Sequence, residues 1–374
     1  MASSVRLAPE VIGGQNVGMQ RSRLTAVHFP VRHLKVPTSW PVGEVTFQPA
    51  GVLQRRLARM ASQRPDPTRF HAEAAAALRG WEWATAQVMT RASPPRWQVP
   101  TDDLRETVRD AIAVLRLYQR ECVPYEDLDE QTFGLVSDIG SETERFWQLD
   151  RAGLRWWGLA RTGVCADFAF TRDHIATFRA RPAFAYLDDA LRCPDDRRSP
   201  FQKRAIAAVR TLNLASAMQR QPQRVILQAV ALEALLGDDQ SSSRSSGRHQ
   251  AHPVARRSAF VTCEVDGARL PAGNQACLCL TADQQEFFLA PEVKARPRDY
   301  WDWPCTYYWH IRQVFDGRNA ALHAATDEFP RRTAVRFEGR VDAVILATLD
   351  WVATVGATGL ADLDDAIATL PVAR

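Results

Sequence analysis

The sequence lacks the short motifs that mark several large classes of enzyme. It contains no His-Glu-x-x-His, no Gly-x-Ser-x-Gly, no dinucleotide-binding fingerprint and no complete phosphate-binding loop. Each of these motifs places the groups that its chemistry needs at a fixed spacing. Their absence therefore removes the usual sequence support for a metalloprotease, an α/β-hydrolase, a dehydrogenase or a P-loop NTPase.

Long apolar runs are also missing. The N-terminus carries no apolar segment of signal-peptide length. The longest nearly uncharged run, residues 343–361, contains Asp350 and scattered Thr and Gly residues, which favours a buried helix over a membrane span. We therefore expect a cytoplasmic protein with no membrane partner. In that compartment the seven Cys residues indicate thiols or metal ligands rather than disulfides.

Neither sign of charge strongly dominates the composition. The 47 basic residues, most of them Arg, exceed the 43 acidic residues by four. This balance permits a polyanionic partner without requiring one. Because the planar guanidinium can bind a phosphate through two hydrogen bonds, the preference for Arg favours nucleic acid as that partner.

The length of 374 residues exceeds what one hydrophobic core usually organises, so two domains are expected. Residues 1–23 are polar and are expected to be disordered. Residues 24–195 are predicted to form a mixed α/β domain of the α+β class. Its predicted elements are strands within 24–36 and 43–48, helices at 71–88 and 104–121, and a hairpin of 154–160 with 164–170.

Residues 199–374 are predicted to form an all-α domain. Ser199 is a typical helix start, because Pro follows it in the first turn. A loop and Cys-containing insertion over 238–305 interrupts the helical pattern. The predicted helices are 199–220, 223–237, one resuming near 253, one through the 310s and 320s, and one over 333–355.

A compact polar group stands near the end of this half, in "YWHIRQVFDGRNAALHAATDEF", residues 308–329. Asn319 and His323 are four residues apart and share a face of a regular helix. Arg318 is rotated by about 100° from Asn319, so it reaches the same place only through its length. An imidazole that transfers protons near neutral pH and a guanidinium that holds phosphate suit phosphodiester chemistry without a metal.

Three segments in this order, "ALEALLG", "ARRSAFVTC" and "YYWHIRQVFDGRNAALH", resemble the HEPN superfamily, and most closely its Apea-like branch. The family signature is Arg, four to six residues, then His, often with a polar residue after the Arg. Arg318, Asn319 and His323 fit its shortest spacing. The resemblance covers about residues 200–356 and implies an all-α HEPN domain for the C-terminal half.

The resemblance also implies an activity. In HEPN ribonucleases two such motifs meet across a dimer interface, and the ribose 2′-hydroxyl attacks the adjacent phosphate. By position, His323 becomes the general acid/base, Arg318 the phosphate clamp and Asn319 the orienting residue. Glu233 matches a recurring acid of the branch, and on so apolar a helix we expect it to be paired, for example with an Arg.

The resemblance implies that the protein is a toxin or anti-phage defence effector that cleaves RNA, with tRNA as one candidate substrate. It also implies a dimer that forms through the HEPN domain. An antitoxin or a trigger protein is an implied partner, and residues 24–195 become a sensor or specificity domain. The alternative is a non-catalytic HEPN module that binds RNA, a nucleotide or a protein partner, because some members of the superfamily bind without cleaving.

Two further sets of residues are candidates for binding. Four Cys residues in and next to the insertion suit tetrahedral zinc, with His252 or His310 as a possible substitute, although free thiols are the alternative. Basic residues that recur beyond the motif and in the loop suit RNA contact, although a solvated face or a linker is the alternative. The residues are Cys263, Cys277, Cys279 and Cys305 for zinc, and Arg256, Arg257, Arg332, Arg336 and Arg340 for RNA.

Overall fold

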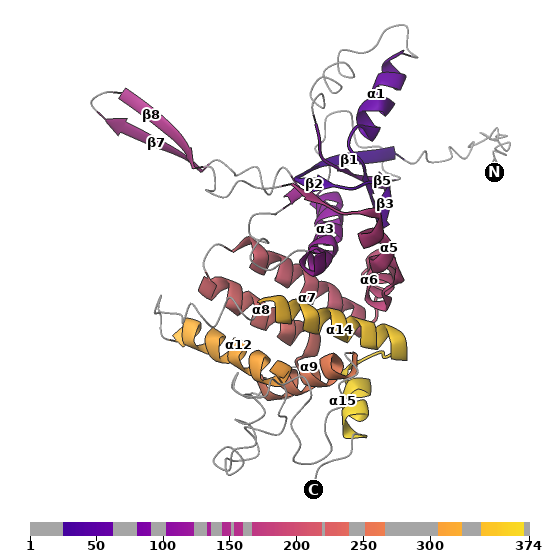
Figure 1. The fold of residues 1–374 in the computed structure, drawn as a ribbon, viewed down its shortest axis with the longest axis vertical. Helices are drawn as coiled ribbons and strands as arrows, with labels where there is room; N and C mark the ends of the chain where they lie inside the picture. Colours follow the sequence, from indigo (N-terminus) through magenta and orange to yellow (C-terminus); the bar gives the residue numbers. More distant parts are fainter. Residues whose placement is uncertain are drawn as a thin grey trace, which may run out of the picture.

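A small sheet near the N-terminus precedes a set of helices in the computed structural model of the chain (Figure 1). This arrangement confirms the coarse prediction of an α+β half followed by a helical half. The structure describes residues 25–62, 81–90, 102–122, 133–135, 144–150, 153–159, 167–218, 221–238, 251–265, 306–323 and 338–369. The predicted disorder of residues 1–23 lies outside this range.

Five strands form the main sheet in the order β3-β4-β5-β1-β6. Side chains alternate between its two faces, as the pleat of a strand requires. On the inner face Phe29, Phe47 and Val88 are buried, and α3 packs against the sheet. His28 and Gln87, which pair across β1 and β5, belong to the opposite face. The strands are β1 (Thr25–Arg32), β3 (Trp40–Val42), β4 (Val45–Gln48), β5 (Thr85–Thr90) and β6 (Gly134–Leu135).

Helix α3 (Asp102–Cys122) confirms the helix predicted over 104–121. Its residues Val108, Ile112 and Leu115 recur at intervals of three and four and are all buried. Two Asp residues in its first turn favour the helix because they face the positive end of the helix dipole. The other described helices of this half are α1 (Val52–Ser62), α5 (Arg172–Ala180) and α6 (Pro182–Arg192).

One predicted helix is wrong in part. Residues 85–88 of the predicted helix 71–88 lie in β5, between β4 and β1, and residues 63–80 lie outside the described range. Ala86 and Val88 are buried whereas Met89 is 47% exposed, which is the period of a strand. Alanine favours a helix, but pairing with two neighbouring strands decides the structure here.

The predicted hairpin of 154–160 with 164–170 is also wrong. β8 (Gly153–Leu159) pairs antiparallel with β7 (Glu144–Asp150), from which two residues separate it. β9 (Phe168–Ala169) instead pairs in parallel with β2 (Leu34–Lys35). The observed hairpin has the shorter connection, and short two-residue loops are the commonest hairpin connections. The pairing of β9 is distant in sequence, so no local pattern indicates it.

The C-terminal half consists of packed helices. α12 lies against α8 and α9, and α14 lies against α9 and against α6 of the other half (Figure 1). Ser199 caps α7, since its hydroxyl oxygen accepts from the Gln202 backbone N–H at 3.1 Å. The helices are α7 (Pro200–Ala217), α8 (Gln221–Leu236), α9 (Ala251–Val265), α12 (Thr306–His323), α14 (Glu338–Val355) and α15 (Leu360–Ala368).

None of the described helices is by itself long and apolar enough to cross a membrane. α14 and α15 reach the required length and hydropathy only as a pair bent by 87°.

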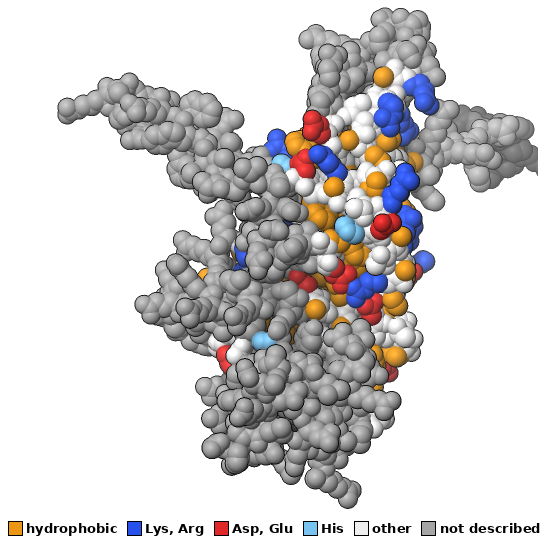
Figure 2. Space-filling model, viewed as in Figure 1, with side chains coloured by type: hydrophobic (Ala, Val, Ile, Leu, Met, Phe, Trp, Pro, Cys, Tyr) orange, Lys and Arg blue, Asp and Glu red, His pale blue; other side chains and the backbone are white. Residues whose placement is uncertain are grey.

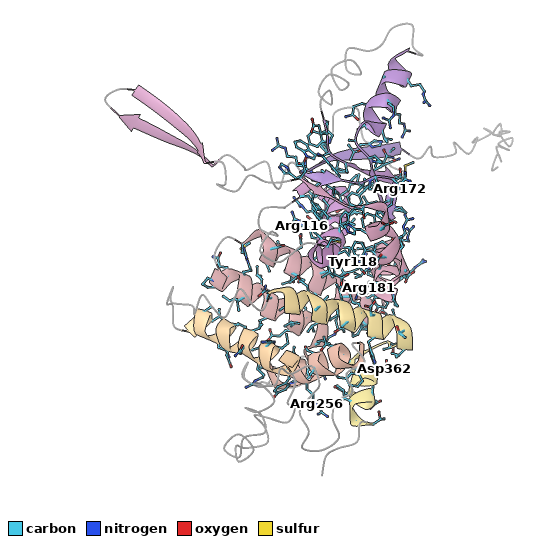
Figure 3. All side chains as sticks on the ribbon, viewed as in Figure 1. Arg116, Tyr118, Arg172, Arg181, Arg256 and Asp362 are labelled. Atoms are coloured by element: carbon cyan, nitrogen blue, oxygen red, sulfur yellow. The ribbon has the colours of Figure 1, made fainter. Side chains whose placement is uncertain are left out.

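The two halves share one core and several ion pairs. The buried apolar residues form one cluster that extends from the sheet to α15. Arg210 of α7 holds Asp110 of α3 through two hydrogen bonds of 2.6 Å. Arg181 pairs with Glu121 and with Asp350 of α14, and it lies beside Tyr118 (Figure 3). The predicted division into domains at 24–195 and 199–374 stays a prediction.

Candidate functional site

The candidate residues lie on α12, where this helix packs against α8. Tyr308, Ile311 and Phe315 recur at intervals of three and four on α12 and are buried, so this face points into the helical half. Arg318 follows Phe315 by three residues and continues the same stripe. Helix geometry therefore directs the Arg318 side chain towards a neighbouring helix.

Arg318 forms an ion pair with Glu233 of α8, in which its Nη1 donates to Glu233 Oε1. The two side chains are only 18% and 19% exposed. The guanidinium carbon lies 5.8 Å from the centre of the Phe315 ring, within the range of a cation–π contact. These two contacts hold the guanidinium in one place, and they confirm that Glu233 is paired with an Arg.

Glu233 lies on the one polar edge of an otherwise apolar stretch of α8. Its neighbours Leu232, Leu235 and Leu236 are fully buried. A carboxylate that is largely withdrawn from water needs a partner, because an isolated buried charge loses its hydration. Arg318 is that partner, so the acid on α8 and the motif on α12 form one unit.

The other two motif residues lie on the same helix as Arg318. Asn319 is half-buried, and His323 is the last residue of α12. Their spacing of four residues places both Cβ atoms on one side of the helix. The side chain of His323 lies outside the described residues, so the predicted approach of its imidazole to Arg318 stays a prediction.

This arrangement has the parts of an anion site. A guanidinium carries five N–H donors in a fixed plane, and the ion pair with Glu233 engages one of its nitrogens. Because Glu233 and Phe315 restrain it, little side-chain entropy is lost when it binds a further acceptor. A phosphate that binds Arg318 would compete with the Glu233 carboxylate for the guanidinium, or share it. Glu233 therefore sets how strongly the site binds anions.

The arginines predicted to contact RNA fall into different environments. Arg257 is 4% exposed, and its donors bind Asp238, Asp364 and the Leu236 carbonyl oxygen. It joins α8, α9 and α15 and offers no open face to a phosphate. Arg256 is exposed on α9. Arg332 and Arg336 lie outside the described residues, and Arg340 lies in α14 with its side chain outside them.

The predicted zinc ligands are not described. Cys277, Cys279 and Cys305 lie outside the described residues, as does the side chain of Cys263 in α9. His310, considered as a substitute ligand, is buried in α12. Within the described part of the chain, no three His, Cys, Asp or Glu side chains are grouped so that they would hold a metal. Zinc stays a prediction.

Sequence reasoning missed the contribution of Phe315. Its ring is fully buried and forms the surface on which the Arg318 guanidinium rests. The signal was available, because an aromatic residue three positions before an Arg on a helix lies on the same face. The apolar stripe of α12 otherwise accounts for Phe315 as a core residue, so the pattern does not separate the two roles.

Comparisons with protein-family models, with curated proteins and with solved structures gave no match to this chain.

Proposed function

We propose that this chain is a metal-independent endoribonuclease whose cleavage site contains Arg318, Asn319 and His323. The observation that carries the proposal is the ion pair between Arg318 and Glu233. It holds the motif arginine on the polar edge of α8, next to Asn319 and on the helix that ends at His323. The family resemblance of residues 200–356 supplies the type of reaction.

In the proposed reaction the ribose 2′-hydroxyl attacks the adjacent phosphorus. The 2′-oxygen forms a bond to phosphorus while the bond to the 5′-oxygen breaks, which leaves a 2′,3′-cyclic phosphate and a 5′-hydroxyl. The proton of the 2′-hydroxyl goes to a base, and an acid gives a proton to the departing 5′-oxygen. His323 serves in this proton transfer, since an imidazole is a base and an acid near neutral pH.

Arg318 stabilises the phosphate, because its charge offsets the negative charge that develops on the phosphate oxygens. Asn319 orients the phosphate or the imidazole through its amide. Glu233 is a positioning residue that acts through Arg318, with which it is paired. This division of roles predicts that loss of Arg318 or His323 removes cleavage, whereas loss of Glu233 changes its rate.

The wider role follows from the same proposal. We place the protein in the cytoplasm as a homodimer that joins through its helical half. It acts on RNA as a toxin or anti-phage defence effector, under control of a trigger or antitoxin, while the N-terminal half selects the RNA or senses the trigger. A structural zinc at the four predicted Cys residues would support the insertion and takes no part in the reaction.

The alternative is a non-catalytic module that binds RNA, a nucleotide or a protein partner. The same ion pair supports it, because an arginine that is four-fifths buried and paired with a carboxylate can also stabilise helix packing. The two proposals differ in what they expect of His323, which only the nuclease requires.

Expression in a bacterial host tests the nuclease proposal. Growth is followed for wild type, Arg318→Ala and His323→Ala, and total RNA is mapped for new 5′-hydroxyl ends. Arg179→Ala is the matched control, since Arg179 is an exposed residue of α5, distant in sequence from the motif. The nuclease proposal predicts slow growth and new 5′-hydroxyl ends with wild type and with Arg179→Ala. It predicts normal growth and no new ends with Arg318→Ala and with His323→Ala. If purified wild type leaves RNA intact with and without EDTA, the binding module is the better account.

A further inference from the structure

The outer face of the N-terminal sheet has a composition that packing alone does not explain. The inner face packs on α3, whereas the outer face carries His28, Gln87 and the 47% exposed Met89. Among the residues that the structure describes, two polar atoms on this face, His28 Nδ1 and Thr85 Oγ1, are buried and have no hydrogen-bond partner. Buried polar atoms of this kind usually have a partner, so the face has unmet capacity for hydrogen bonds.

A basic helix lies at this end of the molecule. α1 contains Arg55, Arg56 and Arg59, all exposed, and it contains no acidic residue. Lys and Arg side chains gather around it in the upper part of Figure 2. Arg56 lies near His28: burial lowers the pKa of this imidazole, and the charge of Arg56 lowers it further. Gln54 of α1 donates to the carbonyl oxygen of Trp81, which lies just before β5, so the basic helix adjoins the end of this strand.

α1 has no acidic residue of its own that could pair with its arginines. Its first turn has no acid to face the positive end of the helix dipole, and Arg55 and Arg56 follow directly after that turn. The Arg55 guanidinium lies over Gly51, where a Cβ atom would be 3.0 Å from Nη1. Positive charge is thus concentrated at the start of α1, and a bound anion would stabilise it.

Aromatic rings adjoin the basic helix. Gln54 of α1 donates to the Trp81 carbonyl oxygen at 3.1 Å, and the Trp81 and Trp83 rings are 4.9 Å apart. The indole N–H of Trp83 donates to Asp167 at 2.6 Å, and the His33 ring lies 5.1 Å from the Trp83 ring, so these contacts fix a half-exposed indole in place. Arg32 lies 6.0 Å from the centre of that ring. Two acids of the described residues also lie here, namely Asp167, which pairs with Lys35 at 2.6 Å, and Glu82.

We propose that α1 and the outer face of the sheet form a binding surface for single-stranded RNA, made of Arg55, Arg56, Arg59, His28, Gln87 and Trp83. Arginines neutralise the phosphates, a fixed and half-exposed indole stacks on a base, and polar side chains of the outer face such as Gln87 bind base edges, which is the combination that single strands require. Leu53 of α1 is buried, so the apolar side of this helix is used in packing and does not suit insertion into a membrane.

This surface deepens the proposed function and rests on it, because it names single-stranded RNA as the substrate and gives the N-terminal half its role. α1 lies at the top of Figure 1, beyond the sheet, whereas α12 lies in the helical half below the sheet. An RNA held at α1 is therefore bound apart from the proposed cleavage site, and binding can be lost without damage to Arg318.

The test is binding of a fluorescent 2′-O-methyl oligoribonucleotide of about twelve nucleotides to the full chain, read by anisotropy. This strand lacks the attacking hydroxyl, so binding is read independently of cleavage. Arg55→Gln/Arg56→Gln is compared with Arg179→Gln/Arg197→Gln, which removes two exposed arginines elsewhere. We expect the first variant to lose affinity roughly 20-fold at 0.1 M salt and to lower the slope of log K against log salt by about 1.4, and the second to lose less than about 2-fold.

Equal affinities for the two variants, or no binding by the wild type, would overturn the proposed surface. Binding of anionic phosphatidylserine vesicles with the same loss in the first variant, and no loss for the oligonucleotide, would assign the surface to membranes instead and would also overturn it. If only the nuclease proposal is wrong, the result is different. The oligonucleotide would still bind through α1, but the wild-type protein would cleave no RNA.

Discussion

The ion pair between Glu233 and Arg318 gives a quantitative test of how the candidate site is built. The perturbation is a double-mutant cycle of Glu233→Ala, Arg318→Ala and the double variant. Exposed ion pairs contribute about 0.2–1 kcal/mol, whereas breaking a buried pair costs about 3–5 kcal/mol. With side chains 18% and 19% exposed, this pair lies between the two, and we expect each single variant to lose about 1.5–3 kcal/mol.

The quantity that decides is the coupling energy. We expect the stability lost in the double variant to be about 1–2 kcal/mol smaller than the sum of the losses in the two single variants. Each single variant leaves the other charge without its partner, and the double variant does not. Urea unfolding followed by tryptophan fluorescence and by circular dichroism measures it, and the two probes have to agree. The exposed pair of Glu106 and Arg109 on α3 is the matched control, with an expected coupling below about 0.5 kcal/mol. Additive losses at Glu233 and Arg318 would refute the geometry of the site.

Three further predictions concern the stability of the fold. Burial and the charge of Arg56 lower the pKa of His28, so the neutral imidazole favours the folded state. This contribution to stability is complete above about pH 6.5 and is lost as the pH falls towards the folded pKa. The urea midpoint of the wild type should therefore fall between about pH 7 and 5, and that of His28→Gln should fall less. Gly43→Ala should lower the free energy of unfolding by about 2–4 kcal/mol, because Gly43 has a φ of 59° and an added Cβ would lie 2.6 Å from Leu191 Cβ. Gly356→Ala should lower it by about 1 kcal/mol, because Gly356 has a φ of 71° but open space around it. Equal losses in the two variants would contradict the close contact at Gly43. Arg257→Ala should lower stability by about 1–3 kcal/mol through its lost hydrogen bonds and leave oligonucleotide affinity unchanged, so a selective loss of affinity would restore Arg257 as an RNA contact.

The sequence was most informative where local chemistry decides the structure. The helix α3, the start of α7 at Ser199 and the end of α14 at Val355 each depend on residues within a few positions of one another. Those predictions were confirmed. β5 and β9 depend on partners far away in the chain, and no neighbouring residue indicates that Phe168 pairs beside Leu34. The corresponding predictions were wrong for that reason.

The candidate site divides in the same way. The need of Glu233 for an arginine follows from one charge on an apolar helix, and that pair is present. The identity of the arginine does not follow, since Arg257 and Arg318 are both carried by helices next to α8. Arg257 instead joins Asp238 and Asp364, a pairing that depends on how α9 and α15 pack. Side-chain pairing between helices is set by packing, which a single sequence does not display.

The most direct test of the central proposal is cleavage of one defined RNA by purified wild-type protein in EDTA. The substrate is a single-stranded RNA with one mapped cleavage position, compared with the same strand carrying a 2′-deoxynucleotide on the 5′ side of that position. The account predicts a 2′,3′-cyclic phosphate and a 5′-hydroxyl from the first strand, no cut at that position in the second, and no product with Arg318→Ala or His323→Ala. Equal cleavage of both strands, or full activity of either variant, would contradict it.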